Sequence, residues 1–389
     1  MRINRFPSLL VLGLVILTMV LAACQTATEA PTQPPAATEA PTQPPEPTQA
    51  PAPTDTVPPV PTDTAVPAAT DTTVPEPTAT VPAPVCDLLP NPPTANAGEL
   101  GSPENPIVIT FVPSGDTGKI TKAGTAIADC LSKMTGLTFE MEVGTTFAAS
   151  IEAMGAEKAQ ISFLNTFSVL LAEQKYDIVP ALVAVRKYAT VDIDPDKDLK
   201  DQLEPFYKGQ FIASVASGIK SFADLKGKTF CFVDPNSTSG YIVPRIILKA
   251  NGIDPDVDFS ATQNAGSHNN VAIAVYKGDC DAGVTFINVL TDTAANLAAT
   301  YPDITEKVTI FAVSDRIPND GMQFIKSLDP KLQSVIVDGM LAMAADPGGN
   351  AVLKSLYNYN AFQKIDPDFY DDFAAVLQAA GVDPASLVK

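Results

Sequence analysis

The segment from Asp234 to Gly240 places three consecutive hydroxyl side chains where a strand-like run, TFCFV, meets a stretch with helical character. A helix start needs only one hydroxyl as N-cap, because a single side-chain oxygen satisfies a free backbone N–H. The other free N–H groups and the helix dipole form a ready site for an anion. From spacing alone, a plain helix cap and an anion site both remain open.

The chain contains a single histidine, His268, and no tryptophan. One histidine cannot build a histidine-cluster metal centre or a two-histidine proton relay. On its own it is as readily a structural residue as a ligand contact. Ser237 and His268 are a conceivable hydrolytic pair, but no G-x-S-x-G motif surrounds the serine. We therefore expect no enzyme activity, no cofactor and no metal.

The overall charge restricts the partners of this 389-residue chain. Its formal net charge is -19 and its isoelectric point is near 4.3. Nucleic acid binding is not expected, because phosphate backbones require Lys and Arg. The same charge offers no long-range attraction to anions, so any anion site must be created locally.

The N-terminus carries the pattern of an export signal. Arg2 and Arg5 precede an apolar run over 9–23, which ends in the sequence LAAC at Cys24. This pattern resembles a bacterial lipobox and predicts a lipoprotein signal peptide over residues 1–23, with lipidation of Cys24. The alternative is an uncleaved membrane helix, for which the run is short. We expect an extracytoplasmic protein anchored to the cell membrane.

Residues 24–85 are rich in Pro, Thr and Ala and contain no Lys or Arg, and the stretch ATEAPTQPP occurs twice. Such a composition cannot bury a core and predicts a disordered tether. A recognition ligand or a glycosylated stalk is the alternative interpretation.

Two series of alternating strands and helices follow the tether. The first predicts strands at 107–112, 137–143 and 160–164, and the second at 229–233, 258–262 and 282–286, with helices between them. Strand-like passages at 178–185, 211–215 and 308–313 carry the chain across and back. The prediction is an α/β fold of two doubly wound lobes with a hinge and an interlobe ligand cleft, lobe I comprising 86–190 and 313–389 and lobe II 191–312.

Four cysteines remain in the exported part, and an even number outside the cytoplasm favours disulfides. Cys231 and Cys280 fall in or beside strands that would be neighbours, so we prefer this pair together with Cys86 and Cys130. Three pairings are possible, and buried free thiols are the alternative.

Several blocks together carry a family resemblance. The segment from Gly218 to Pro255, which includes STSGYIVP, resembles the phosphate/phosphite/phosphonate-binding (PhnD-like) family of periplasmic components of ABC transporters. The blocks GSH at 266–268 and KGDCDAG at 277–283, and the return segment RIPND at 316–320, resemble the same family. The resemblance covers about 105–389 and implies a type II periplasmic-binding-protein-like fold.

The resemblance also implies the site. Ser237, Thr238 and Ser239 would hold the phosphoryl oxygens together with helix N–H groups, and His268 would add a hydrogen bond from the same lobe. Such a site is mostly neutral and avoids the desolvation of a buried Arg or Lys. The full set of candidate ligand-binding residues is Ser114, Phe147, Asn165, Thr166, Ser237, Thr238, Ser239, Gly240, His268, Asn288 and Asp320.

Departures from the family pattern bear on the ligand. Phe147 stands where family members often have Tyr, and Asn165 and Thr166 replace a Gly-Pro loop. Asn288 falls where aminophosphonate-binding relatives place a carboxylate for the amine. We therefore expect phosphite, phosphate or a small phosphonate with an uncharged tail rather than an aminoalkylphosphonate.

The implied partners are an ABC permease and its ATPase, and we expect a monomer. Alternatives are a binding protein for sulfonate, taurine-like or thiamine-precursor solutes, and a ligand-binding sensor component. The acidic run over 192–201 is interpreted as a solvated loop, with a calcium site as the alternative. Tyr357, Tyr359 and Phe362 are interpreted as core packing.

Overall fold

The computed structural model describes residues 82–384, which belong to one compact unit, Glu76–Lys389. The predicted signal peptide over 1–23, the lipidation site Cys24 and the tether up to residue 81 lie outside the described residues. Among residues 82–384, no helix combines the length and the apolar character needed to cross a membrane.

The first lobe is built on a mixed sheet with strand order β14-β4-β13-β3-β1-β2, to which β5 is added beside β4. The three strands β1, β2 and β3 are parallel, whereas β13, β4 and β14 pair antiparallel. The strands are β1 Ile107–Phe111, β2 Phe139–Val143, β3 Ile161–Phe163, β4 Val179–Lys187, β5 Leu203–Glu204, β13 Gly321–Phe324 and β14 Ala361–Lys364.

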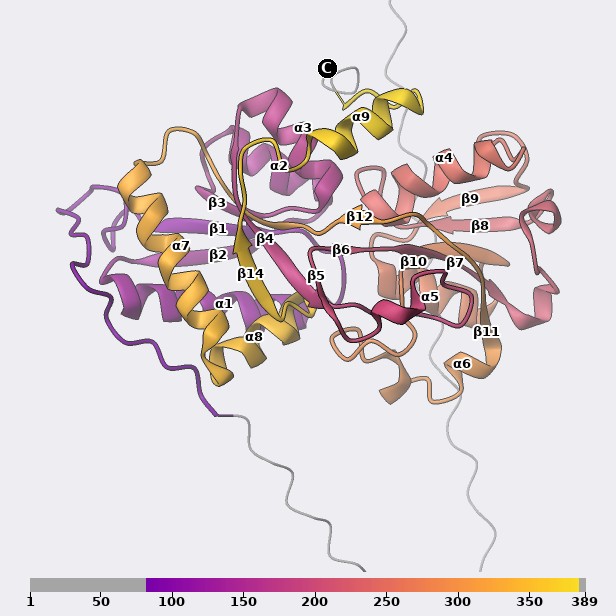
Figure 1. The fold of residues 1–389 in the computed structure, drawn as a ribbon, viewed down its shortest axis with the longest axis horizontal. Helices are drawn as coiled ribbons and strands as arrows, with labels where there is room; N and C mark the ends of the chain where they lie inside the picture. Colours follow the sequence, from indigo (N-terminus) through magenta and orange to yellow (C-terminus); the bar gives the residue numbers. More distant parts are fainter. Residues whose placement is uncertain (1–81, 385–389) are drawn as a thin grey trace, which may run out of the picture. The chain divides into compact units, whose positions relative to one another are not determined.

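Helices cover both faces of this sheet (Figure 1). Helices α1, α7 and α8 pack against one another on one side, and α2 and α3 pack against each other on the other. The side chains of β1, which are buried along nearly their whole length, fill the core between these layers. The helices are α1 Thr117–Thr135, α2 Phe147–Gly155, α3 Thr166–Tyr176, α7 Pro330–Ala345, α8 Pro347–Tyr357 and α9 Asp371–Ala379.

The second lobe has a five-stranded mixed sheet with order β11-β7-β10-β8-β9. Its strands are β7 Gly209–Ser214, β8 Thr229–Phe232, β9 Ala261–Asn264, β10 Ala282–Phe286 and β11 Val308–Val313. Its helices are α4 Val243–Ala250, α5 His268–Lys277 and α6 Ile304–Lys307, with a π-helix at Thr238–Ile242 and short 3₁₀ turns at Val215–Ser217, Phe222–Leu225 and Leu297–Ala299. Strand β9 begins later than the predicted 258–262, because Asp258 is held in a turn by backbone and side-chain bonds with Asp254.

Two crossing segments connect the lobes and pair with each other. Strand β6, Phe206–Tyr207, runs antiparallel to β12, Ile317–Pro318. Because β5 adds to the first sheet, the chain leaves that lobe at 205–208 rather than at the predicted boundary near 191. The predicted two-lobed α/β fold is confirmed, and both sheets are mixed rather than wholly parallel.

The acidic run over 192–201 contains the 3₁₀ turn Lys197–Leu199. Its composition predicted a solvated loop, and the structure agrees with this prediction only in part. Asp194 is fully buried and contacts Lys208 Nζ at 2.8 Å, and Asp196 joins the same lysine to Arg316. Burial alone would raise the pKa of Asp194, but the hydrogen bond from Lys208 holds it below its usual value. The interpretation as a solvated loop was wrong for Asp194, because its counter-charge arrives from the start of β7. Within residues 82–384 no cluster of His, Cys, Asp or Glu is arranged to hold a metal ion.

Two disulfides join the preferred cysteine pairs, Cys86 with Cys130 and Cys231 with Cys280. Cys86 bonds to Cys130 with a Cα–Cα distance of 5.2 Å and ties the segment before β1 to helix α1. Cys231 bonds to Cys280 with a Cα–Cα distance of 5.9 Å. The second disulfide connects β8 to the turn that precedes β10, which is the adjacent strand.

Candidate functional site

A cavity of about 120 Å³ lies between the lobes and is lined by residues of both. A cavity of roughly 150 Å³ in another protein holds the six carbon atoms of benzene, so this one suits a ligand of about five non-hydrogen atoms. Its walls come from the loop after β1, the starts of α2, α3 and α5, the π-helix, the crossing segments and the end of α8.

The π-helix and α4 form one continuous helical segment whose first turn faces the cavity. Ser237 is its N-cap and accepts a hydrogen bond from Gly240 N at 3.2 Å. Asp234 shapes the preceding turn by accepting from Asn236 N at 2.8 Å. The N–H groups of the first turn have no intrahelical acceptor, so they and the helix dipole present positive potential to the cavity.

His268 is the first residue of α5 and is held as a neutral hydrogen-bond donor. Its Nδ1 accepts from Phe286 N at 3.0 Å, so the ring proton of the neutral imidazole must be on Nε2. Burial lowers the pKa of His268 to about 3, which keeps the ring uncharged at neutral pH. Nε2 lies 3.5 Å from Ser237 Oγ, so the two groups converge on the same part of the cavity.

Tyr207 of β6 completes this group of neutral donors. Its hydroxyl lies 3.3 Å from Ser239 Oγ, and it donates to that oxygen. Burial raises the pKa of Tyr207 to about 12, so the phenol stays protonated. Ser239 therefore accepts from Tyr207 and keeps its own proton available for a ligand oxygen.

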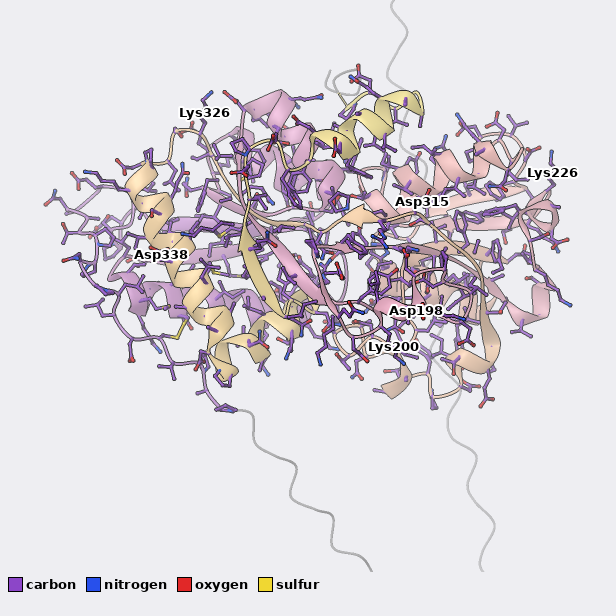
Figure 2. The ribbon with its side chains drawn as sticks, viewed as in Figure 1. Asp198, Lys200, Lys226, Asp315, Lys326 and Asp338 are labelled. Atoms are coloured by element: carbon purple, nitrogen blue, oxygen red, sulfur yellow. A yellow bond between two sulfur atoms is a disulfide. The ribbon has the colours of Figure 1, made fainter. Side chains whose placement is uncertain are left out.

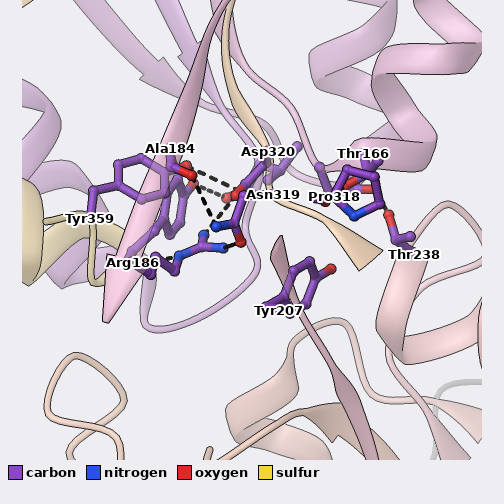
Figure 3. A network of polar contacts seen from close by, with 12 residues as sticks. Thr166, Ala184, Arg186, Tyr207, Thr238, Pro318, Asn319, Asp320 and Tyr359 are labelled. Carbon is purple, nitrogen blue, oxygen red and sulfur yellow. Dashed lines mark hydrogen bonds and ion pairs between the residues drawn. The ribbon is translucent and has the colours of Figure 1, made fainter. Parts of the chain in front are cut away.

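Arg186, at the end of β4, lies in the cavity lining beside the ring of Tyr207 and is already neutralised (Figure 3). Its guanidinium contacts Asp320 Oδ1 at 2.6 Å and donates to Asn319 Oδ1 and to the carbonyl of Tyr357. The second oxygen of Asp320 accepts from Tyr359 at 3.0 Å. Because each charge is paired, this wall does not place a free positive charge against the ligand.

Thr238 connects the two lobes directly, and Figure 3 shows it across from the crossing segment. Its Oγ1 accepts from Phe167 N at 2.8 Å and donates to Asn165 Oδ1 at 2.7 Å. Both partners stand at the start of α3 in the first lobe. This hydroxyl is therefore committed to holding the lobes together.

Further hydrogen bonds across the interface hold the lobes in a closed arrangement. Burial raises the pKa of Asp234 in the second lobe, and the nearby backbone N–H of Phe147 at the start of α2 partly offsets this effect. Three more bonds join His268 N to the Ser114 carbonyl at 3.0 Å, Lys119 Nζ to the Ala294 carbonyl at 2.7 Å, and Asn358 Nδ2 to Asp292 Oδ2 at 2.7 Å.

Eight of the eleven candidate residues line the cavity: Ser114, Phe147, Asn165, Ser237, Thr238, Ser239, His268 and Asp320. The other three lie outside its lining. Thr166 donates its hydroxyl to the Pro318 carbonyl at 2.7 Å. Gly240 packs so closely on Val233 that a Cβ would lie 2.3 Å from it, which gives the glycine a packing role. Asn288 lines a separate cavity.

Several residues of the lining were not predicted from the sequence: Arg186, Tyr207 and Asn269. Tyr357 was interpreted as core packing. Its hydroxyl instead donates to the Val112 carbonyl at the cavity wall. Tyr359 is fully buried and Phe362 nearly so, as expected for core residues. Asp292, four residues beyond Asn288, is the carboxylate that this loop brings to the cavity. In the sequence, the acidic side chain of Asp292 was the one feature that could have indicated a role in the site.

Comparison with known proteins gives a family match over most of the folded part. The family described as the periplasmic substrate-binding protein of phosphonate ABC transporters matches residues 109–370. The chain is 26% identical over 244 residues to the phosphate-import protein PhnD of Mycolicibacterium smegmatis, covering 59% of this chain and 72% of that protein. It is 30% identical over 156 residues to the phosphonates-binding periplasmic protein of Escherichia coli, covering 39% of this chain and 45% of that protein.

Two solved structures share the fold. A binding protein component of an ABC phosphonate transporter from Pseudomonas aeruginosa superposes with a TM-score of 0.59 at 22% identity, over 72% of this chain and 92% of that one. PhnD1 from Prochlorococcus marinus, solved in complex with methylphosphonate, gives 0.58 at 17% identity, over 71% of this chain and 98% of that one. At these identities the likeness concerns the fold alone.

Proposed function

Because the chain belongs to the family of periplasmic substrate-binding proteins of phosphonate ABC transporters, we propose that it captures a small phosphorus oxyanion between its lobes. The ligand is a phosphonate, phosphite or phosphate, and the protein delivers it to an ABC permease and its ATPase. The family is one of transport proteins, and the chain is not an enzyme.

The observation that supports this ligand class is the convergence of neutral donors at one end of the cavity. Ser237, Ser239 and His268 Nε2 meet there with the first turn of the π-helix. Short hydrogen bonds and dipoles stabilise an oxyanion without a buried counter-ion, and donors to a charged oxygen are roughly twice as strong as those to a neutral one. An oxyanion with several exposed oxygens uses such a set fully.

The tail of the ligand faces a different wall. Asn288 lies outside the cavity and Asp292 lies in its lining, so the neutral amide of Asn288 gives no reason to exclude an aminoalkylphosphonate. Both oxygens of Asp292 already accept hydrogen bonds, from Ala295 N and from Asn358. An ammonium group on the ligand would therefore compete with Asn358 for Asp292.

The predicted lipid anchor at Cys24 completes the proposal. A binding protein held at the membrane surface stays near its permease, and more than one acyl chain is what stable anchoring needs. In a Cys24→Ala variant, the protein should move from the membrane fraction to the soluble fraction. Gel filtration of that variant checks the proposed monomer.

Isothermal titration calorimetry of the purified chain tests the ligand class directly. The ligands are phosphite, phosphate, methylphosphonate, 2-aminoethylphosphonate and taurine. We expect one-to-one binding of a phosphorus compound and at least about tenfold weaker binding in Ser239→Ala, because a hydrogen bond to a charged group is lost. The matched control is Ser260→Ala, which removes an exposed serine in the same lobe.

Two outcomes decide between solute classes. Binding of taurine alone would transfer the chain to the sulfonate-binding alternative. If 2-aminoethylphosphonate is the preferred ligand, Asp292→Asn should weaken its binding while leaving methylphosphonate unaffected. Equal loss of both ligands would mean that Asp292 only supports the closed lobes through Asn358.

A further inference from the structure

A second, larger cavity of about 550 Å³ adjoins the ligand cavity. The two share four lining residues: Lys187, Tyr188, Ala189 and Asn358. The second cavity is bounded by the end of β4 and the loop between β4 and β5, by the turn after β10, and by the end of α8 with the residues that follow it. It therefore has walls from both lobes.

Lysines dominate the charged lining of this cavity. Lys187, Lys200 and Lys354 are exposed, and within residues 82–384 none of their ammonium groups has an ion pair or a hydrogen bond. Lys200 is labelled in Figure 2, close to Asp198 on the loop between β4 and β5. Asp201 is the single acidic residue of the lining. The cavity is thus a local positive region on a chain with a net charge of -19.

We propose that this second cavity is an anion-collecting vestibule for the ligand cavity. The inference rests on the proposed function, because it requires an anionic ligand. A hollow lined by charges of one sign concentrates oppositely charged solutes and raises association rates by about 10- to 1000-fold. Here it offsets locally the repulsion that an acidic protein exerts on an approaching oxyanion.

The wall between the two cavities contains a contact that opens with the lobes. Asn358 lines both cavities and donates across the interface to Asp292, which lines the ligand cavity. When the lobes separate, this bond breaks and the lysines flank the open cleft. All three lysines stand on the first lobe: Lys187 ends β4, Lys200 lies between β4 and β5, and Lys354 lies on α8. The anion therefore passes from unpaired lysines to the neutral donors of the inner site.

Association kinetics test the vestibule. Stopped-flow tyrosine fluorescence gives association and dissociation rates for methylphosphonate or phosphate, whichever the full chain binds. The variant Lys200→Gln/Lys354→Gln, which removes the two lysines that line the second cavity alone, should associate about tenfold more slowly at an ionic strength of about 0.01 M. Its dissociation rate should change less than about twofold, because these lysines contribute to approach rather than to the bound state. At about 1 M the two association rates should converge.

The matched control is Lys220→Gln/Lys277→Gln, which removes two exposed lysines that line neither cavity. It should keep the wild-type association rate. Equal slowing of both double variants would show an effect of overall charge and would overturn the vestibule. Unchanged association in the vestibule variant would also overturn it, with the proposed function intact. Absence of binding by the wild-type chain would overturn the proposed function and the vestibule with it.

Discussion

The substitution His268→Asn separates the two roles of this imidazole. Nδ1 accepts from Phe286 N at 3.0 Å, and an asparagine Oδ1 occupies nearly the same position relative to the backbone. The variant therefore keeps the acceptor that anchors the strand β10 to the helix α5. It loses the Nε2 donor, which lies near Ser237 and faces the ligand cavity.

The expected loss of affinity follows from the charge of the acceptor. A hydrogen bond to a charged oxygen contributes about 1.5–3 kcal/mol, which corresponds to roughly 10- to 150-fold in Kd. Titration calorimetry of the wild-type chain and the variant measures this ratio. The matched control is His268→Gln, whose longer side chain places an amide donor near the original Nε2. It should retain more of the affinity than His268→Asn.

The pH dependence provides a second readout of the same argument. Burial lowers the pKa of His268 to about 3, so the ring is a neutral donor throughout pH 5–8. The ratio of Kd values between the variant and the wild type should stay constant over this range, because the ligand's own titration cancels. A ratio that rises about tenfold toward pH 5 would show that a cationic imidazole binds the ligand, and the reasoning would be refuted.

Because of this residue, the stability of the wild-type chain should also decrease as the pH falls. The folded pKa of His268 is below the unfolded value of about 6.5, so its stabilising neutral form is fully populated above that value. Stability is lost as the pH falls from about 6.5 toward 3, by about 1.4 kcal/mol per unit at most. Between pH 6.5 and 5 the wild-type chain should lose roughly 2 kcal/mol more than His268→Asn in urea unfolding.

Two further predictions concern charges outside the donor group. Burial and the nearby Asp371 raise the pKa of Glu173 to about 7, so the folded chain loses stability as the pH rises from 4.5 to 7. Because the side chain is partly exposed, we discount the full effect and expect Glu173→Gln to stabilise the chain by about 1–2 kcal/mol at pH 8. At pH 4 urea unfolding should show no difference between the variant and the wild type. Arg186→Met should lower the free energy of unfolding by about 3–5 kcal/mol, because it leaves Asp320 buried without its partner. The double variant Arg186→Met/Asp320→Asn should recover most of that loss. A double variant as unstable as the single one would contradict the pairing.

The fold was predictable because its signals are local. Alternating apolar runs and helical stretches give two series of strands and helices, and the crossing strands were visible as additional β-branched runs. The pairing of Cys231 with Cys280 follows from adjacent strands in the same way. The two-residue strand β5, which adds to the first sheet, is too short to give a sequence pattern.

The missed site residues depend on contacts between distant segments. In the sequence, Arg186 looks like the polar end of a strand, and its ion-pair partner Asp320 lies 134 positions later. Tyr207 reads as part of a connection between strands, and its position opposite Ser239 depends on β6 pairing with β12. No periodicity within one segment carries such information, so these residues become visible only when the crossing segments are placed.

The three consecutive hydroxyls of the segment STS divide into three different roles. Successive residues of a helix point about 100° apart, so adjacent side chains cannot all face one ligand in the same way. Ser237 accepts from Gly240 N as the cap, Thr238 is bonded to the start of α3 in the other lobe, and Ser239 accepts from Tyr207. A cap alone would explain only the first. Under the proposed function, the triplet couples ligand capture to lobe closure, because the turn proposed to present donors to the oxyanion also supplies the hydroxyl that joins the lobes.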